Sequence, residues 1–192
     1  LKTKEDLMAL FINPKPAEVT YEDGIYVGYR YFATFGVKPA YEFGFGLSYT
    51  EFTYSDLAVS SPVFKGKQTI SFVVTNTGKT AGREVVQLYI EAPASVIDKP
   101  KKELKGFAKT RLLQPGESQT ITLTLAARDL SSFNTAESAW VADAGKYMVQ
   151  VGASSENIRI TGEFTMKSRI VTEKVNKVLA PAVQINELKK KL

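Results

Sequence analysis

Apolar and polar residues alternate along most of the chain between residues 52 and 166, in short runs that turn residues separate. A period of two is typical of strands that bury one face in an antiparallel sheet. In the second run Ile70, Phe72 and Val74 share one face, and Asn76-Thr77-Gly78 then supplies a turn. The pattern predicts strands over residues 52–59, 67–75, 83–92, 104–112, 118–126, 139–141, 146–152 and 158–166.

No helical pattern separates these runs, so a parallel sheet, whose strands need long crossover connections, is not expected. Seven or eight short strands over about 100–120 residues predict an immunoglobulin-like antiparallel β-sandwich. The most strictly alternating run places Ile121, Leu123 and Leu125 inward between threonines. Tyr147 follows a turn at the start of a strand, which is the position of a tyrosine corner, and we interpret it and Trp140 as structural residues.

The two ends of the chain lack this alternation. Thr3 is placed to cap a short helix that Asn13-Pro14 would end, because proline disfavours the helical region in the residue before it. Pro181 interrupts the C-terminal stretch, which we expect either to wrap back over the body or to fray. Apolar residues fall at helical spacing in both stretches: Leu7, Leu10 and Phe11 in the first, and Ile185, Leu188 and Leu192 in the second.

Aromatic residues concentrate between residues 21 and 54, which hold 12 of the 21 in the chain, with glycines interspersed. Each ring can bury about 150–250 Å², so this block needs a surface to pack on. We interpret it as a docking seam between modules, with Tyr29, Tyr31, Phe43 and Phe45 as the candidate interface residues. Sugars also stack on exposed aromatic faces, so a carbohydrate platform is the alternative. Two or three coplanar, exposed rings would favour that alternative.

Five sequence blocks follow one another along residues 21–166: EDGIYVGYRYF, FGFGLSYTEFTYSDL, GREVVQLYI, KKELKGFAKTRLLQPGES and AGKYMVQVGAS. Together they resemble the C-terminal portion of glycoside hydrolase family 3, the β-glucosidase and β-xylosidase enzymes. Many members have histidine between the two glycines of the second block, where this chain has Phe45. In that family a barrel domain comes first and an α/β sandwich domain second. In many members a fibronectin type III-like β-sandwich follows.

The resemblance implies three parts. Residues 1–46 would be the end segment of the α/β sandwich domain with its linker, residues 47–167 the fibronectin type III-like β-sandwich, and residues 168–192 a C-terminal tail. The expected fold class is therefore mainly β. It is an immunoglobulin/fibronectin type III-like antiparallel β-sandwich with an N-terminal segment resembling the end of an α/β sandwich domain.

The same resemblance implies a parent enzyme that releases terminal sugars from β-linked glycosides. In that family the nucleophilic aspartate belongs to the barrel and the acid/base carboxylate to an earlier part of the second domain, and neither segment is present here. We therefore expect no catalytic residue in this chain, and we interpret Glu22 and Asp23 as surface or turn residues. The chain would be an accessory or scaffold part. The alternative is a carbohydrate-binding or protein-interaction β-sandwich module.

The amino-acid composition excludes several kinds of catalytic and metal site. The chain contains no cysteine and no histidine, which excludes thiol nucleophiles, His-containing triads and most zinc sites, and we expect no metal and no cofactor. A net charge of +5 does not predict nucleic-acid binding, because the lysine-rich stretches and the aromatic block are separate. We expect one cluster of lysines to lie in a solvated loop: Lys99, Lys101, Lys102 and Lys105.

The expected partners are the missing N-terminal barrel and α/β domains of the parent enzyme. Two further partners are left open. One is an oligosaccharide, and the other is a second copy of this chain in a homo-oligomer. No stretch approaches the ~20 apolar residues of a membrane span, so no membrane partner is expected. The resemblance implies a periplasmic or extracellular location.

Overall fold

The computed structural model describes residues 3–5, 8, 19–178 and 180–190 of the chain. A short helix, α2 (Tyr29–Phe35), precedes a series of strands. The strands are β1 (Phe52–Val59), β2 (Lys67–Asn76), β3 (Val85–Glu91), β4 (Glu103–Lys109), β5 (Ser118–Ala126), β6 (Ser132–Asn134), β7 (Ala139–Ala142), β8 (Gly145–Gly152), β9 (Ile158–Met166) and β10 (Ile170–Lys174). β1, β5 and β9 begin and end at the predicted residues, and the other predicted strands are shifted by a few residues at one or both ends.

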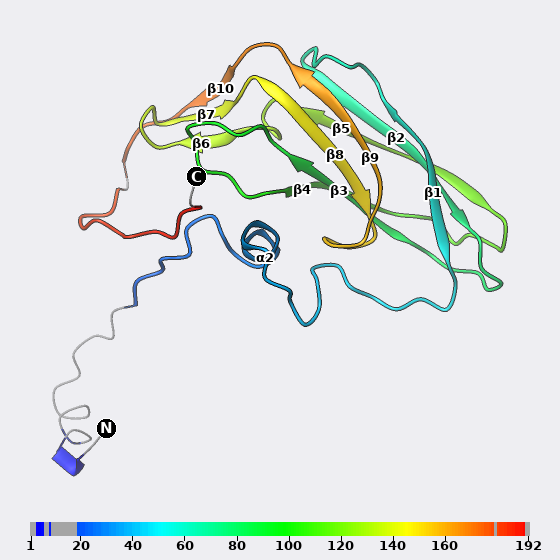
Figure 1. The fold of residues 1–192 in the computed structure, drawn as a ribbon, viewed down its shortest axis with the longest axis horizontal. Coiled ribbons are helices and arrows are strands. Elements are labelled where there is room, and N and C mark those ends of the chain that lie inside the picture. Colours follow the sequence, from blue (N-terminus) through cyan, green and yellow to red (C-terminus); the bar gives the residue numbers. More distant parts are fainter. Residues whose placement is uncertain (1–2, 6–7, 9–18, 179, 191–192) are drawn as a thin grey trace.

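Two antiparallel sheets form the sandwich (Figure 1). One has the strand order β1-β2-β5 and the other the order β4-β3-β8-β9. Neighbouring strands in both sheets run antiparallel, and between β1 and β9, where every residue is described, no helix intervenes. These features confirm the predicted mainly β antiparallel sandwich. A third sheet, β10-β7-β6, extends one end of it.

The core lies between the two large sheets, because each strand directs alternate side chains inward. Ile70, Phe72 and Val74 are buried on β2, as predicted, and Leu88 of β3 and Val149 of β8 are buried on the opposite sheet. All five belong to one hydrophobic cluster. The alternation in the sequence therefore sets which face of each strand meets the other sheet.

One inward-facing residue is less buried than its alternation predicts. Ile121 and Leu125 of β5 are 5% and 1% exposed, whereas Leu123 between them is only half-buried. Leu123 lies at the edge where β5 faces β4, next to Gly106, which contributes no side chain to cover it. The exposure of Leu123 thus depends on packing at this edge, about which the period of two gives no information.

A tyrosine corner fixes the turn between β7 and β8. The Tyr147 ring is buried, and its hydroxyl donates a 2.8 Å hydrogen bond to the carbonyl oxygen of Asp143. This bond confirms the structural interpretation of Tyr147. Trp140 on β7 is partly buried and carries the Arg128 guanidinium over its ring at 4.0 Å, so it also makes a structural contact.

The sequence pattern does not predict three of the elements, namely α2, β6 and β10. The two strands span only 3 and 5 residues, which is too short to show a clear period. α2 is bounded by Gly28 and Gly36, whose φ angles are 58° and 67°. Glycine adopts such angles readily, so the ends of α2 are set by backbone conformation rather than by the spacing of apolar residues.

The C-terminal stretch wraps back over the body, which confirms one of the two expectations for it. The Leu188 amide donates a 2.7 Å hydrogen bond to the Glu22 carbonyl. The expected helix through Ile185 is wrong, since residues 180–190 contain no helical residue. Several residues of the predicted terminal helices lie outside the described residues: Leu7, Leu10, Phe11, Asn13, Pro14 and Leu192. Of the helices in the described ranges, none is long and apolar enough to cross a membrane.

We expect Leu125→Ala to lower the free energy of unfolding by about 2–5 kcal/mol, because the side chain is buried and its removal leaves a cavity between the sheets. Leu123→Ala should cost about 1 kcal/mol, since that side chain is only half-buried. Thr122→Ala, on the exposed face of the same strand, is the control and should change the value by less than about 0.5 kcal/mol. Urea denaturation followed by circular dichroism measures all three. Equal losses for Leu123 and Leu125 would contradict the described packing.

Candidate functional site

The aromatic segment, which we define as residues 21–49, lies across the outer face of the β4-β3-β8-β9 sheet (Figure 1). Tyr29 makes the central contact, because its ring centroid lies 5.6 Å from that of Tyr89 on β3. The Tyr29 hydroxyl also accepts a 2.8 Å hydrogen bond from the Leu104 amide. An ion pair of 3.1 Å between α2 and β4 adds to this contact. The segment is therefore attached to the sandwich of its own chain.

A second anchor holds the segment after α2. The Ser154 hydroxyl donates a 3.0 Å hydrogen bond to the Glu42 carboxylate, and the amide of the next residue in the β8–β9 turn donates one of 2.8 Å to the Phe43 carbonyl. Gly44 follows with a φ of 87°, and a Cβ at this position would overlap the side-chain amide of Gln87. The close approach and the positive φ both require glycine here.

A buried polar cluster lies under these two anchors. Gln87 and Tyr89 point away from the core on β3, yet they are 6% and 0% exposed. The Tyr89 hydroxyl donates a hydrogen bond to the Gln87 side chain, and burial raises the pKa of this hydroxyl, which keeps it a donor. The Lys102 ammonium donates to the Ser155 carbonyl and lies 3.4 Å from the Glu156 carboxylate. Because Gln87, Tyr89 and Lys102 have hydrogen-bond partners, the aromatic segment can cover them without leaving their polar atoms unsatisfied.

The four predicted interface residues lie in the aromatic segment and outside the hydrophobic core cluster, but they do not form one group. Tyr29 pairs with Phe43 at 5.3 Å between ring centroids, Phe45 pairs with Tyr41 at 5.1 Å, and Tyr31 contacts other rings of α2. Tyr29 and Tyr31 are half-buried, whereas Phe43 and Phe45 are 51% and 47% exposed. Tyr29 thus attaches the segment, and Phe43 and Phe45 are available for contact.

Sequence reasoning missed part of this surface. Every second residue over 41–49 is large and apolar, and all of them are between 47% and 98% exposed. We call these residues the exposed stripe: Tyr41, Phe43, Phe45, Leu47 and Tyr49. Their spacing is visible in the sequence, and this period of two is the signal that would add Tyr41, Leu47 and Tyr49 to the predicted set.

The rings of the aromatic segment do not form a flat platform. Tyr41 and Phe45 are inclined to each other by 49°, and Tyr29 and Phe43 by 34°. Among the described residues, the near-parallel ring pairs lie in the core or against it. Inclined, separate rings fit an irregular protein surface better than the flat face of a sugar.

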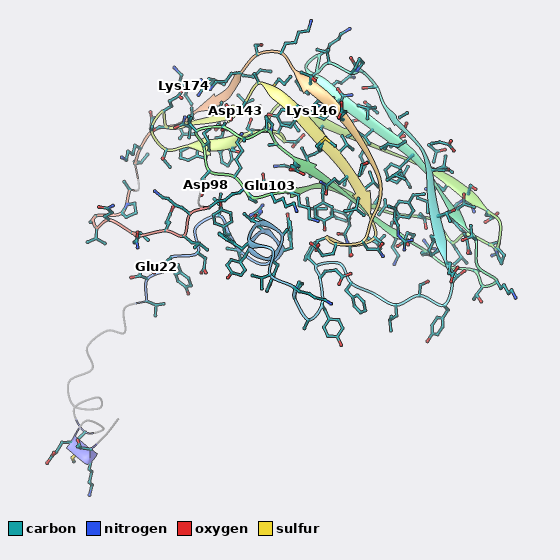
Figure 2. The ribbon with its side chains drawn as sticks, viewed as in Figure 1. Glu22, Asp98, Glu103, Asp143, Lys146 and Lys174 are labelled. Atoms are coloured by element: carbon teal, nitrogen blue, oxygen red, sulfur yellow. The ribbon has the colours of Figure 1, made fainter. Side chains whose placement is uncertain are left out.

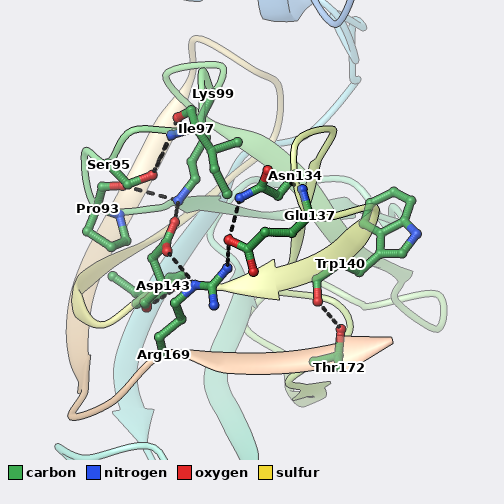
Figure 3. Close-up of polar contacts among 11 residues, drawn as sticks. Pro93, Ser95, Ile97, Lys99, Asn134, Glu137, Trp140, Asp143, Arg169 and Thr172 are labelled. Carbon is green, nitrogen blue, oxygen red and sulfur yellow. Dashed lines mark hydrogen bonds and ion pairs between the residues drawn. The ribbon is translucent and has the colours of Figure 1, made fainter. Parts of the chain in front are cut away.

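The lysine cluster is largely paired, which corrects the expectation of a solvated loop. Lys99 forms a 2.6 Å ion pair with Asp143, and the two side chains are 8% and 13% exposed. Figure 3 shows this pair beside a second one between Arg169 and Glu137. Burial alone would raise the pKa of the Asp143 carboxyl, but hydrogen bonds from Lys99 and Ser95 and the nearby positive charges lower it overall. The other lysines differ: Lys101 is exposed, Lys102 is buried, and Lys105 is half-buried.

The two acidic residues near the aromatic block lie at a turn. Glu22 and Asp23 are exposed, and the Asp23 carbonyl accepts a 3.0 Å hydrogen bond from the Tyr26 amide. These positions agree with their interpretation as surface or turn residues. Within the described ranges, no three acidic side chains lie close enough together to hold a metal ion.

Comparison with known proteins identifies similar sequences and folds. A family model described as a fibronectin type III-like domain matches residues 84–155. Probable β-glucosidase L of Emericella nidulans is 44% identical over 163 residues, which cover 76% of this chain and 22% of that protein. β-Glucosidase 3B of Thermotoga neapolitana, solved in complex with α-D-glucose, has a TM-score of 0.75 at 56% identity, over 79% of this chain and 21% of that one. The GH3 β-glucosidase of Bifidobacterium adolescentis has a TM-score of 0.71 at 36% identity, over 74% and 21%.

The chain spans about a fifth of the length of these relatives. The five sequence blocks, the antiparallel sandwich and these similarities all agree on one family and one domain type. The chain therefore belongs to glycoside hydrolase family 3, as a C-terminal portion of a β-glucosidase-like member with its fibronectin type III-like domain.

Proposed function

We propose that this chain is the accessory part of a β-glucosidase-like glycoside hydrolase, in which it braces the neighbouring domain. The parent enzyme would release terminal sugars from β-linked glycosides, and its catalytic pair of carboxylates would lie outside this chain. The observation that carries the proposal is the exposed stripe, on a chain that spans about a fifth of its relatives. In the parent, the barrel and α/β domains would cover this stripe.

The stripe is held in place at Phe43, because the hydrogen bonds of Glu42 and Phe43 attach this part of it to the β8–β9 turn. Within the stripe Phe45 packs against Tyr41, and Phe43 packs against Tyr29 beside it. Apolar side chains that gather on a protein surface mark an interaction site. Burying one large apolar side chain contributes about 1.5–3 kcal/mol, so covering the stripe would offset much of the entropy lost when two domains dock. A stripe that is ordered before contact also loses less entropy on docking.

We also propose the division of the chain that the family resemblance implies. Residues 1–46 would be the end segment of the α/β sandwich domain with its linker, residues 47–167 the sandwich, and residues 168–192 the tail. All strands of the two large sheets lie between residues 52 and 166, which supports the second part. β10 pairs with β7, so the tail begins as part of the third sheet.

A carbohydrate-binding or protein-interaction module is the second candidate. Its support is the exposure of Tyr41 and Tyr49, which are 73% and 98% exposed, since tyrosine combines an apolar ring with a hydrogen-bonding hydroxyl. Titration with soluble β-linked oligosaccharides, followed by NMR, separates the two candidates. Saturable binding that Tyr49→Ala weakens would favour a sugar-binding module over a brace.

The purified chain should not hydrolyse aryl β-glycosides, because retaining hydrolysis needs two carboxylates and the family resemblance implies that both would lie in domains outside this chain. The chain also has no histidine to act as a base. Release of nitrophenol from p-nitrophenyl β-glucoside should equal that in buffer. Turnover above buffer that a single Asp→Asn or Glu→Gln change abolishes would show that a catalytic pair is present.

The isolated chain should bind a hydrophobic dye and scatter more light as its concentration rises, because the stripe is uncovered. Replacing both Phe43 and Phe45 by serine should lower both signals about threefold or more. Phe107→Ser is the matched control, since Phe107 is 69% exposed on β4, outside the stripe, and it should change them less. A strict monomer that binds no dye would contradict the stripe as a docking surface.

Gly44→Ala should detach the second anchor, because the new Cβ overlaps Gln87 at a backbone angle that alanine rarely adopts. The Ser155 amide, which donates to the Phe43 carbonyl, should then exchange with deuterium about tenfold faster or more. Gly46→Ala is the control, since an added Cβ there meets no atom within 4 Å. Equal exchange in the two variants would disprove the anchor.

A further inference from the structure

Three parts of the chain that are distant in sequence meet at Asp98, in the loop between β3 and β4. The Tyr26 hydroxyl, from the aromatic segment, donates a 2.5 Å hydrogen bond to Asp98 Oδ1. The Lys190 amide, from the C-terminal tail, donates one of 3.2 Å to Asp98 Oδ2. Figure 2 shows Asp98 beside the tail and close to α2. One carboxylate therefore joins the tail, the aromatic segment and the sandwich.

Asp98 is a firm anchor for both of its partners. Its neighbour Lys99 forms the buried ion pair with Asp143 that holds the loop on the β7–β8 turn (Figure 3). Tyr26 is 2% exposed, and its ring packs edge-on against Phe35 at 5.0 Å. Burial, and then the Asp98 carboxylate, raise the pKa of the Tyr26 hydroxyl. The hydroxyl therefore keeps its proton and stays a donor.

The tail is attached more lightly than the loop. In its last part, described over residues 180–190, the hydrogen bonds to the body come from two amides, that of Leu188 to the Glu22 carbonyl at 2.7 Å and that of Lys190 to Asp98 at 3.2 Å. The Leu188 side chain is still 37% exposed. A cavity of about 700 Å³ lies between the tail and the loop, with Ile25 and Leu188 in its walls. A contact with so few bonds and a cavity beside it can open without disturbing the sheets.

We propose that residues 184–190 form a detachable strap that holds the start of the aromatic segment on the sandwich, with Asp98 as its anchor. With the strap in place, the Leu188 and Lys190 amides hold Glu22 and Asp98, the residues on either side of the Tyr26 hydrogen bond. When the strap leaves, these two hydrogen bonds are lost, and the segment from Glu22 to α2 gains freedom to separate. The consequence rests on the proposed function, since loss of the strap would leave the exposed stripe held only by Tyr29 and by the second anchor when its partner domain meets it.

Hydrogen exchange of the full chain tests the strap. Asp98→Asn keeps the size of the side chain but removes its charge and one of its two acceptor atoms. Amides of Tyr26 and of α2 should exchange about tenfold faster or more, while those of β2 and β5 change by less than about twofold. Glu163→Gln is the matched control, because it removes an exposed ion pair with Lys146 between β8 and β9, and it should leave α2 unchanged.

A chain that ends at Val178 is the second test. Its α2 amides should exchange at least as fast as those of the Asp98→Asn variant, and an excess of a synthetic peptide of residues 180–190 should restore their protection. Unchanged protection of α2 in both variants would overturn the strap. So would equal loss of protection in β2 and β5, because Asp98 would then stabilise the whole sandwich. A peptide that restores nothing would contradict detachment.

These measurements are independent of the docking partner. They report only on contacts within the isolated chain, whereas dye binding and light scattering report on the exposed stripe. The strap can therefore fail while the stripe behaves as a docking surface, and the reverse outcome is equally recognisable.

Discussion

The outer arrangement of the molecule depends on the contact between the aromatic segment and the outward face of β3. Tyr89 and Gln87 point away from the core but are almost fully buried, so something other than the second sheet has to cover them. Tyr29 packs on Tyr89, and Gly44 lies against Gln87. The hydrogen bond of Tyr29 with the Leu104 amide fixes its ring over β3 and β4. Once Tyr29 is fixed, α2 and the residues after it have a defined course, and this course places the exposed stripe.

Buried polar groups add specificity to this arrangement more than they add stability. Lys99 with Asp143, and Lys102 with Ser155, take cations out of water. The desolvation cost of such groups offsets much of their attraction. Removing one partner, however, leaves an uncompensated buried charge, which is strongly unfavourable. Other placements of the β3–β4 loop and of the β8–β9 turn are therefore disfavoured, and the two anchors of the aromatic segment keep their positions relative to each other.

The alternation of apolar and polar residues was enough to predict the sandwich, because the buried face of a strand is recognisable from residues that are neighbours in the sequence. β5 and β9 have the predicted bounds for that reason. The missed features depend on contacts distant in sequence. Lys99 belongs to a run of lysines, which indicates solvent unless its partner Asp143, 44 residues away, is known. The exposed stripe shows a period of two, which also predicts a strand, but the backbone turns within it: the Phe45 amide donates a 3.0 Å hydrogen bond to the Glu42 carbonyl, and Gly44 has a φ of 87°.

The composition of the stripe bears on how the proposed partner domain would pack against it. Glycine alternates with large side chains at Phe43, Gly44, Phe45 and Gly46. Gly44 lies against the Gln87 side chain, whereas a Cβ added at Gly46 would meet no atom within 4 Å. A side chain of the proposed partner could therefore pack beside Gly46 and reach the close packing of a protein interior. Glycine also loses the most backbone freedom when it is ordered. Because the sandwich already holds Gly44 against Gln87, docking of the proposed partner would cost less entropy.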